Sequence, residues 1–296
     1  MHGVAESPRP LDAAAARRHF ERAATTYAAA TPLEAEIGQR MLARLDYVRA
    51  TPRSILDAGA GPAREADALL ARYPGAALVA LDASRAMLQA GLRRRGWRDW
   101  LRRTAPRLPV VADFAHMPLA RGCIDLLWSN MALHWAVAQE AVLREFARVL
   151  APNGLLMFST LGPDTLKELR LAAGDAQAHS FMDMHDLGDA LVAAGFAAPV
   201  MDAEIVTLTY ADPEGLMSDL RRSGQTSARA DRVRGLRGRG FLARLHAALV
   251  AQAAGGRLSA TFEVVYGHAW KGEKRRSEDG RAVIRTDGLG LRHKNR

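Results

Sequence analysis

The sequence predicts an α/β fold in which helices cover both faces of an open, mainly parallel sheet. Residues 53–63 read RSILDAGAGPA: a short apolar run ends in an acidic residue and a glycine-rich turn, and a helical pattern begins directly afterwards. Three further apolar runs of strand length follow, and each also leads into Asp or Asn. Buried strands that alternate with helices are typical of a Rossmann-like sheet, whose ligand crevice lies at the carboxyl ends of the strands.

The composition suits a folded protein in a reducing compartment. Of the 296 residues, 49% are hydrophobic, which is enough for a substantial core. The single cysteine, Cys123, excludes an intrachain disulfide and a site built from several thiolates, so we expect a cytoplasmic location and no metal centre. No apolar run reaches the length of a membrane span, and we expect no membrane partner.

The net charge of +9 comes from two late stretches. Residues 221–244 hold eight Arg and one Asp, and residues 271–296 hold nine Lys or Arg and four acidic residues, whereas the rest of the chain is slightly acidic. Neither stretch has the interleaved aromatic residues of a protein that binds single-stranded nucleic acid. We therefore expect no nucleic-acid partner and a local basic patch for an acidic partner.

The first 50 residues are expected to form a helical arm packed on the sheet. Residues 12–49 are rich in Ala and other helix formers and are interrupted at Thr31-Pro32, which predicts two helices. Phe20 and Tyr27 lie seven positions apart and would share one helix face. That face is either part of the core, or it lets Tyr27 close over a ligand.

The glycine turn after the first strand favours a ligand without phosphate groups. Gly59 and Gly61 let the backbone bend sharply and let a ligand approach closely. A dinucleotide or phosphate loop relies on free backbone amides at the start of a helix, whereas Pro62 removes one amide and no Lys-Ser or Lys-Thr pair follows. The turn is therefore built for close contact but not for a phosphate.

The polar residues after successive strands predict a nucleoside-type ligand. Residues 77–82 end in Asp82, 21 positions after Gly61, close to the spacing at which such folds place a carboxylate on ribose hydroxyls. Residues 108–114 end in Asp113 and Phe114, which suit the amine and the ring face of a base. The predicted ligand contacts are Tyr27, Asp57, Gly59, Gly61, Asp82, Asp113, Phe114 and Asn130.

The second half of the chain is expected to complete a seven-stranded sheet and to add a lid. The remaining strands are expected at residues 123–130, 155–160, 200–210 and 261–270. An insertion at about 211–258 would lie over the crevice as a helical lid. The main domain would span residues 51–270, with a disordered basic tail at 271–296 and a surface excursion of unassigned role at 91–107.

Several stretches resemble one family of methyltransferases. The D-x-G-x-G turn is similar to the first motif of class I S-adenosylmethionine-dependent methyltransferases. Residues 18–27, 128–135, 158–170 and 261–270 resemble the malonyl-[acyl-carrier protein] O-methyltransferases of biotin synthesis. The resemblance implies S-adenosylmethionine as cofactor, and transfer of its methyl group to the free carboxylate of a malonyl thioester on acyl carrier protein, a step toward pimelate.

A malonyl carboxylate needs positioning rather than activation. Its pKa is expected near or below ~4, so it is ionised at neutral pH and no general base is required. A cation must hold it in line with the methyl group, and the fork of an Arg side chain suits this role. We expect Arg170 to be this catalytic anchor. The expected neighbours in the substrate pocket are His134, Trp135, Thr160, Asp164, Thr165, Tyr266 and His268.

The first basic stretch lies in the expected lid, above the crevice. Because acyl carrier proteins are acidic, the resemblance implies that the malonyl-loaded carrier docks on this stretch. The candidate docking residues are Arg229, Arg232, Arg234, Arg237 and Arg239.

Two points leave alternatives open. Ala63 stands where such methyltransferases usually carry a third glycine, so the cofactor pocket is expected to be slightly narrower and to bind more weakly. The block at residues 158–170 also resembles a mitochondrial assembly factor of a respiratory complex. The alternatives are therefore a methyltransferase that acts on a quinone or a small acid, and a cofactor-binding assembly factor.

Overall fold

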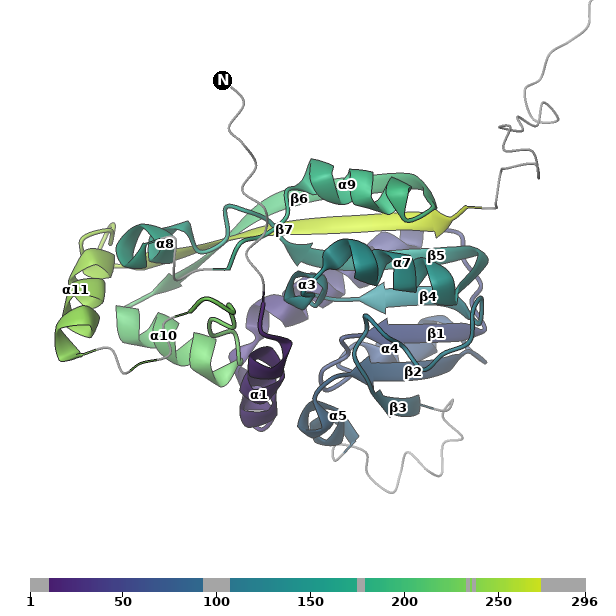
Figure 1. The fold of residues 1–296 in the computed structure, drawn as a ribbon, viewed down its shortest axis with the longest axis horizontal. Coiled ribbons are helices and arrows are strands. Elements are labelled where there is room, and N and C mark those ends of the chain that lie inside the picture. Colours follow the sequence, from purple (N-terminus) through teal and green to yellow (C-terminus); the bar gives the residue numbers. More distant parts are fainter. Residues whose placement is uncertain (1–10, 93–106, 175–178, 233–234, 236–237, 273–296) are drawn as a thin grey trace, which may run out of the picture.

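Seven strands form one sheet in the order β3-β2-β1-β4-β5-β7-β6 (Figure 1). The computed structural model describes residues 11–92, 107–174, 179–232, 235 and 238–272. The strands are β1 (Ser54–Ala58), β2 (Ala77–Asp82), β3 (Arg107–Val111), β4 (Ile124–Ser129), β5 (Leu150–Leu161), β6 (Phe196–Tyr210) and β7 (Leu258–Lys271).

The first five strands run parallel, and β7 is antiparallel to both of its neighbours. Because successive side chains of a strand point to opposite faces, Ile55 belongs to one hydrophobic core and Leu56 to the other. The strand order reverses at β1, which lies between β2 and β4. In an open α/β sheet this reversal opens a crevice at the carboxyl ends of the strands, where the sequence places its polar residues.

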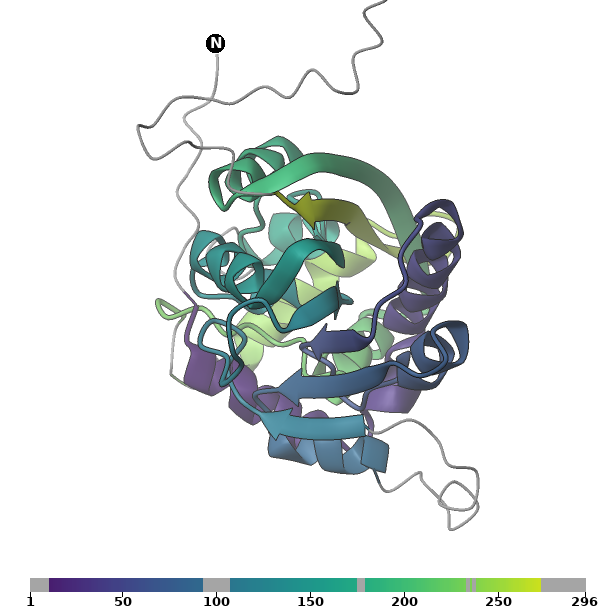
Figure 2. The same ribbon diagram turned by 90° about the vertical axis from the view of Figure 1, so that its right-hand side faces the viewer.

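Helices cover both faces of the sheet (Figure 2). One face carries α3 (Pro32–Arg44), α4 (Ala66–Arg72) and α5 (Arg85–Leu92), and the other carries α7 (Gln139–Val149) and α9 (Met184–Ala193). The spacing of the apolar residues explains why these segments fold as helices against the sheet. In α7 they recur every three or four positions, so that one stripe is buried and Glu140 and Arg144 lie on the outer side.

The N-terminal arm has one more break than the sequence predicts. It consists of α1 (Ala13–Ala23), α2 (Tyr27–Ala30), α3 and the 3₁₀ turn η1 (Leu45–Tyr47). The additional break lies at Thr26, whose hydroxyl donates to the carbonyl of Ala23 at 3.1 Å and to that of Arg222 at 2.7 Å. Such side-chain bonds to the backbone compete with the helix, which explains why α1 stops there.

The expected insertion lies between the end of β6 at Tyr210 and the start of β7 at Leu258. It contains α10 (Pro213–Arg222) and α11 (Arg239–Val250). Together with α8 (Lys167–Ala173), these helices gather beside the long ends of β6 and β7, and α1 lies between α10 and the strands β1 to β3 (Figure 1). The insertion is therefore placed to contribute to a site at the strand ends.

Some expectations fall outside the described residues. They are most of the excursion at 91–107, nearly all of the tail at 271–296, and the docking candidates Arg234 and Arg237. Within the described part of the chain, no helix is long and apolar enough to cross a membrane. The same residues contain no group of three or more His, Cys, Asp or Glu side chains that could hold a metal ion.

Candidate active site

A cavity of about 120 Å³ lies at the carboxyl ends of β1, β2 and β4, and α1 covers it. We call it the strand-end cavity. From α1 it receives Ala13, Ala16, Arg17 and Phe20. Of the residues predicted to contact a nucleoside, those that line it are Tyr27, Gly59, Gly61, Asp82, Asp113, Phe114 and Asn130.

The glycine turn brings the backbone close to this cavity. Gly59 and Gly61 have φ angles of +76° and +53°, a region that favours glycine. A Cβ at Gly59 would lie 2.3 Å from the Cβ of Ala132, and a Cβ at Gly61 would lie 3.8 Å from the ring of Tyr27. Any larger residue at Gly61 would therefore fill the space between the turn and Tyr27.

Asp82 ties the end of β2 to the glycine turn. One carboxylate oxygen accepts the Gly61 amide at 2.8 Å and the other accepts the Ser84 amide at 2.7 Å. Burial raises the pKa of Asp82 to about 6, although both hydrogen bonds act in the opposite direction. Asp82 thus holds the turn and still presents its carboxylate to the cavity.

Asp57 lies beneath the turn and does not line the cavity. Its side chain is buried, and its Oδ2 atom has no hydrogen-bond partner among the described residues. Burial raises the pKa of Asp57 well above its usual value, and the nearby carboxylates of Glu65 and Asp82 raise it further. A donor or a positive charge above the turn would relieve this cost.

Asn130 connects the end of β4 to the arm while it lines the strand-end cavity. Its amide donates to the carbonyl of Glu34 at 2.9 Å, and its Oδ1 accepts from Ser159 at 2.8 Å. At the far side, the Asp113 carboxylate accepts the amide of Ala115 at 2.8 Å. Phe114 packs edge-on against Phe146, which fixes the orientation of its ring. The cavity therefore has rigid polar and aromatic walls.

A second cavity, of about 220 Å³, lies among α8, α10, α11 and β7. We call it the insertion cavity. Its walls are mainly apolar, with Leu169, Met217, Leu245 and Phe262 among them. Trp135, in the 3₁₀ turn η2 (Leu133–Trp135), lines both cavities. The two cavities are therefore neighbours with a shared aromatic wall.

The histidines of the insertion cavity are neutral. Burial lowers the pKa of His134 to about 3 and that of His179 to about 4. The Nδ1 atom of His134 lies 3.4 Å from the hydroxyl of Thr160, and His179 accepts the amide of Ala228 at 3.1 Å. Trp135 packs edge-on against His179, with ring centres 4.9 Å apart. These residues form a fixed polar and aromatic wall.

The structure places the predicted substrate residues in different parts of the molecule. His134, Trp135 and Thr165 line the insertion cavity, and Thr160 lies directly behind His134. Asp164 is exposed and lines neither the strand-end nor the insertion cavity, and its amide donates to Glu263 at 2.8 Å.

Arg170 also lines neither of these cavities. Its guanidinium donates to the carbonyls of Pro163 and, at 2.9 Å, of Thr165. Both acceptors lie within seven positions, in the loop that precedes α8. Both bonds come from the Nη2 atom, which ties Arg170 to this loop, whereas its Nε atom is buried without a hydrogen-bond partner among the described residues. The anchoring role expected for Arg170 stays a prediction, and its position outside both cavities does not favour it.

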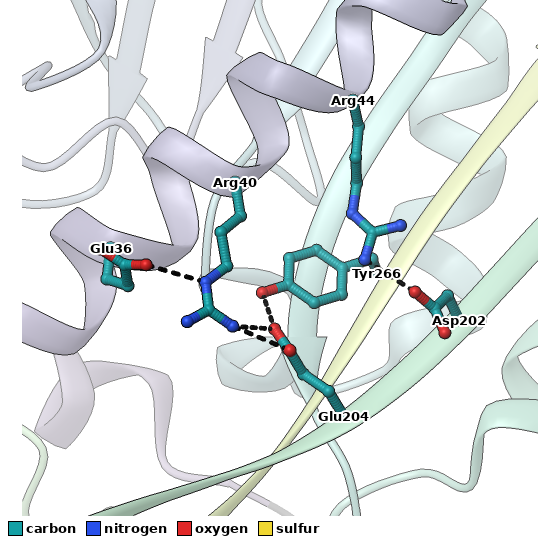
Figure 3. A network of polar contacts seen from close by, with 6 residues as sticks. All are labelled: Glu36, Arg40, Arg44, Asp202, Glu204 and Tyr266. Carbon is teal, nitrogen blue, oxygen red and sulfur yellow. Dashed lines mark hydrogen bonds and ion pairs between the residues drawn. The ribbon is translucent and has the colours of Figure 1, made fainter.

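Tyr266 and His268 lie away from the insertion cavity. They line a separate hollow with Met41, Arg44 and Tyr47, between α3, η1 and the sheet. Tyr266 lies four residues beyond Phe262 on β7, roughly 13 Å further along an extended strand. Its hydroxyl donates to Glu204, which also accepts two bonds of 2.8 Å from Arg40 (Figure 3). The length of β7 separates the two sites, so the substrate role predicted for this pair does not fit the fold.

Two arginines in the basic stretch of the insertion, Arg229 and Arg232, are engaged in internal contacts. Arg229 is only 2% exposed and binds Asp231 at 2.8 and 2.5 Å. Arg232 donates to the carbonyl of Arg229 at 2.6 Å and pairs with Asp12 at 3.1 Å. The docking role predicted for Arg229 is therefore corrected, since it is buried. Arg239 is exposed at the start of α11.

Sequence reasoning missed a segment that fastens α1 over the strand-end cavity. We call residues 222–232 the clasp segment. The Ala228 carbonyl accepts the Asp12 amide at 2.7 Å, and Thr226 lies 2.9 Å from the His19 ring. Gln225 donates to the buried carboxylate of Glu34. These partners are about 190 to 220 positions apart, and no local pattern in the sequence signals such contacts.

Comparison with known proteins agrees with this architecture. The family described as "Methyltransferase domain" matches residues 56–158. The chain is 48% identical to the malonyl-[acyl-carrier protein] O-methyltransferase of Methylovorus sp. (strain MP688), over 90% of this chain and 91% of that protein. It is also 48% identical to the protein of the same name from Laribacter hongkongensis (strain HLHK9), over 92% and 95% of the two chains.

Solved structures show the same fold at low sequence identity. The YcgJ protein from Bacillus subtilis superposes with a TM-score of 0.56 at 15% identity, over 79% of this chain and 99% of that one. A SAM-dependent methyltransferase from Thermotoga maritima gives a TM-score of 0.51 at 14% identity, over 86% and 99%.

Proposed function

The chain belongs to the malonyl-[acyl-carrier protein] O-methyltransferase family, and on this basis we propose that it methylates the free carboxylate of a malonyl thioester on acyl carrier protein, at the start of pimelate and biotin synthesis. Its cofactor is S-adenosylmethionine. The observation that supports the proposal is the pair of adjoining cavities, one at the strand ends with Asp82, Asp113 and Asn130 in its walls and one in the insertion, with Trp135 between them.

The residues of the strand-end cavity fit S-adenosylmethionine. Asp57 lies beneath the turn, outside the lining of the cavity, and its unpartnered Oδ2 would attract the positive end of the cofactor, while a Cβ at Gly61 would narrow the space beside Tyr27. Asp82 would accept the ribose hydroxyls, while Asp113 and Phe114 would hold the adenine. Tyr27 and Asn130 would complete the walls.

The chemistry requires alignment and no proton transfer. S-adenosylmethionine supplies a methyl group bound to a positively charged sulfur. A carboxylate oxygen forms the new O–C bond as the S–C bond breaks and its electron pair stays on sulfur, so that an ester and a thioether, both neutral, result. Neutral His134 is not needed as a base, which agrees with its pKa of about 3. The protein's task is to hold the two groups in line and to exclude water.

The carrier would dock beside the insertion cavity. Arg239 and Arg244 are exposed on α11, and Phe241 and Leu245 of the same helix line the cavity. An acidic carrier bound to these two arginines could deliver its malonyl group past α11. We propose a cytoplasmic location, which a single free cysteine suits.

The test is mass spectrometry of malonyl-acyl carrier protein after incubation with the purified protein and S-adenosylmethionine. We expect a gain of one methylene group, and none with acetyl-acyl carrier protein, which has no free carboxylate. Binding of S-adenosylhomocysteine, measured by calorimetry, serves as the control for an intact cofactor site. Cofactor binding without any methylation of the malonyl carrier would refute the proposal and would favour a quinone or small-acid substrate.

A further inference from the structure

The insertion cavity has a single charged wall residue among those the structure describes. Its other titratable wall residues, His134 and His179, are neutral because burial lowers their pKa values to about 3 and about 4. Arg221 carries the charge. A carboxylate that enters this mainly apolar space would therefore find one cation.

Arg221 is an exposed residue that lines the insertion cavity; its backbone is fixed and its guanidinium is uncommitted. It lies in the last turn of α10, whose Leu216 and Leu220 are buried. Its backbone carbonyl accepts the amide of Gly224 at 3.2 Å. No described carboxylate or carbonyl pairs with its side chain, in contrast to Arg170 and Arg229.

Ser227 offers a second free donor on the same wall. Its hydroxyl oxygen is buried and has no hydrogen-bond partner in the described part of the chain. The polar neighbours that precede it are committed elsewhere, Gln225 to Glu34 and Thr226 to His19. Thr165, on the opposite side, exchanges hydrogen bonds with the backbone of Glu263.

We propose that Arg221 and Ser227 bind the free carboxylate of the malonyl group, in place of Arg170. This assignment rests on the proposed function. A guanidinium matches a carboxylate geometrically and can bind it through two parallel hydrogen bonds. The methyl ester product carries no charge, so the interaction that holds the substrate is lost when the reaction is complete. The pair therefore distinguishes malonyl from acetyl thioesters and also favours product release.

The test compares the affinity for malonyl- and acetyl-acyl carrier protein, measured by calorimetry with S-adenosylhomocysteine present. Both ligands dock through the same carrier protein, so any effect of a substitution on docking cancels in the ratio of the two dissociation constants. We expect the wild-type protein to prefer the malonyl carrier by at least about tenfold, as for a charged hydrogen bond. Arg221→Ala should reduce this ratio to near one, Ser227→Ala should reduce it partly, and Arg221→Lys should restore part of it.

Arg222→Ala is the matched control, because Arg222 is the next residue on α10 and lines neither cavity. It should leave the ratio unchanged, as should Arg170→Ala. All variants should bind S-adenosylhomocysteine like the wild type, which shows that they are folded. A full malonyl preference in Arg221→Ala would overturn the assignment while leaving the proposed function intact. A wild-type protein that neither methylates nor prefers the malonyl carrier would overturn both.

Discussion

Ala63 adopts a left-handed backbone conformation at the end of the glycine turn, with φ at +51°. The sequence suggested that its methyl group narrows the cofactor pocket, but Ala63 does not line the strand-end cavity. It contacts a smaller hollow on the other side of the turn, next to Leu88 and Gly91. The departure from glycine therefore affects backbone strain and not the space for the cofactor.

Ala63→Gly should accordingly raise the free energy of unfolding by up to about 1 kcal/mol and leave cofactor affinity unchanged. Glycine relieves the strain of the left-handed conformation, but it also gains more freedom in the unfolded chain, which offsets part of the benefit. Urea denaturation and calorimetry with S-adenosylhomocysteine would measure the two quantities. A tenfold gain in affinity would contradict this view and would support the narrower pocket.

The proposed role of Asp82 predicts that cofactor binding depends on pH. The pKa of Asp82 in the folded protein is about 6, above its usual value of 3.8. The folded state therefore favours the neutral carboxyl group, and the stability that this group gives the protein is full below about pH 4 and is lost as the pH rises through 6. The ionised form is the better acceptor for ribose hydroxyls. We therefore expect the dissociation constant of S-adenosylhomocysteine to rise as the pH falls from 7 to 5. In Asp82→Asn this pH dependence of the dissociation constant should disappear. If it persists, another titratable group causes it.

The sequence predicted most of the residues that line the strand-end cavity, but it did not predict which residues line the insertion cavity. Asp57, Asp82 and Asp113 follow predicted strands, and parallel strands bring their carboxyl ends to one edge. Arg170 looked equally suitable for a carboxylate, but it lines neither cavity and its Nη2 atom is bound to nearby backbone carbonyls. Arg221 is one of eight arginines in its stretch, and only the fold shows which of them faces a cavity.

At the scale of elements, the clasp segment and α1 act together. Gly224 lies where they meet, with φ at +78°. A Cβ there would lie 3.0 Å from the ring of Phe20 and 3.2 Å from the Cβ of Ala23. Phe20 lines the strand-end cavity, so a displacement of α1 would change the cavity proposed for the cofactor. The strands were predicted from local apolar runs, but this contact joins segments about 200 positions apart, so no local sequence pattern predicts it.

We expect Gly224→Ala to weaken the binding of S-adenosylhomocysteine several-fold, although Gly224 does not line the cavity. Gly75→Ala is the matched control, since Gly75 also has a positive φ of +89° but nothing within 4 Å of an added Cβ. Both changes should cost roughly 1 kcal/mol of stability through backbone strain. If the two variants bind S-adenosylhomocysteine with equal affinity, the position of α1 does not depend on this contact.

At the scale of the whole molecule, a polar network joins the arm to the far strands of the sheet. Arg40 binds Glu36 and Glu204, and Arg44 binds Asp202 at 2.7 Å while it lies over the ring of Tyr266 (Figure 3). These contacts fasten α3 to β6 and β7. The network therefore fastens the arm to the sheet on the same face as Phe262 of the insertion cavity, but further along β7.

Tyr266→Phe should lower the free energy of unfolding by about 1 kcal/mol, because Glu204 loses one hydrogen bond. Methyl transfer should remain at the wild-type rate, since Tyr266 lines neither the strand-end nor the insertion cavity. Thermal unfolding and the mass-spectrometric assay would test the two expectations. A large loss of activity in a stable variant would contradict this expectation and would support the role in substrate binding that the sequence suggested for Tyr266.

The clasp segment has a consequence for how such enzymes can be rebuilt. The insertion between β6 and β7 shapes the insertion cavity, and its clasp segment also meets Asp12, His19 and Glu34 of the arm. A chimera that received the insertion of a relative with another substrate would therefore carry mismatched surfaces against its own arm and would close poorly over the cofactor. Substrate range in this scaffold is transferable only when both segments are exchanged as a pair.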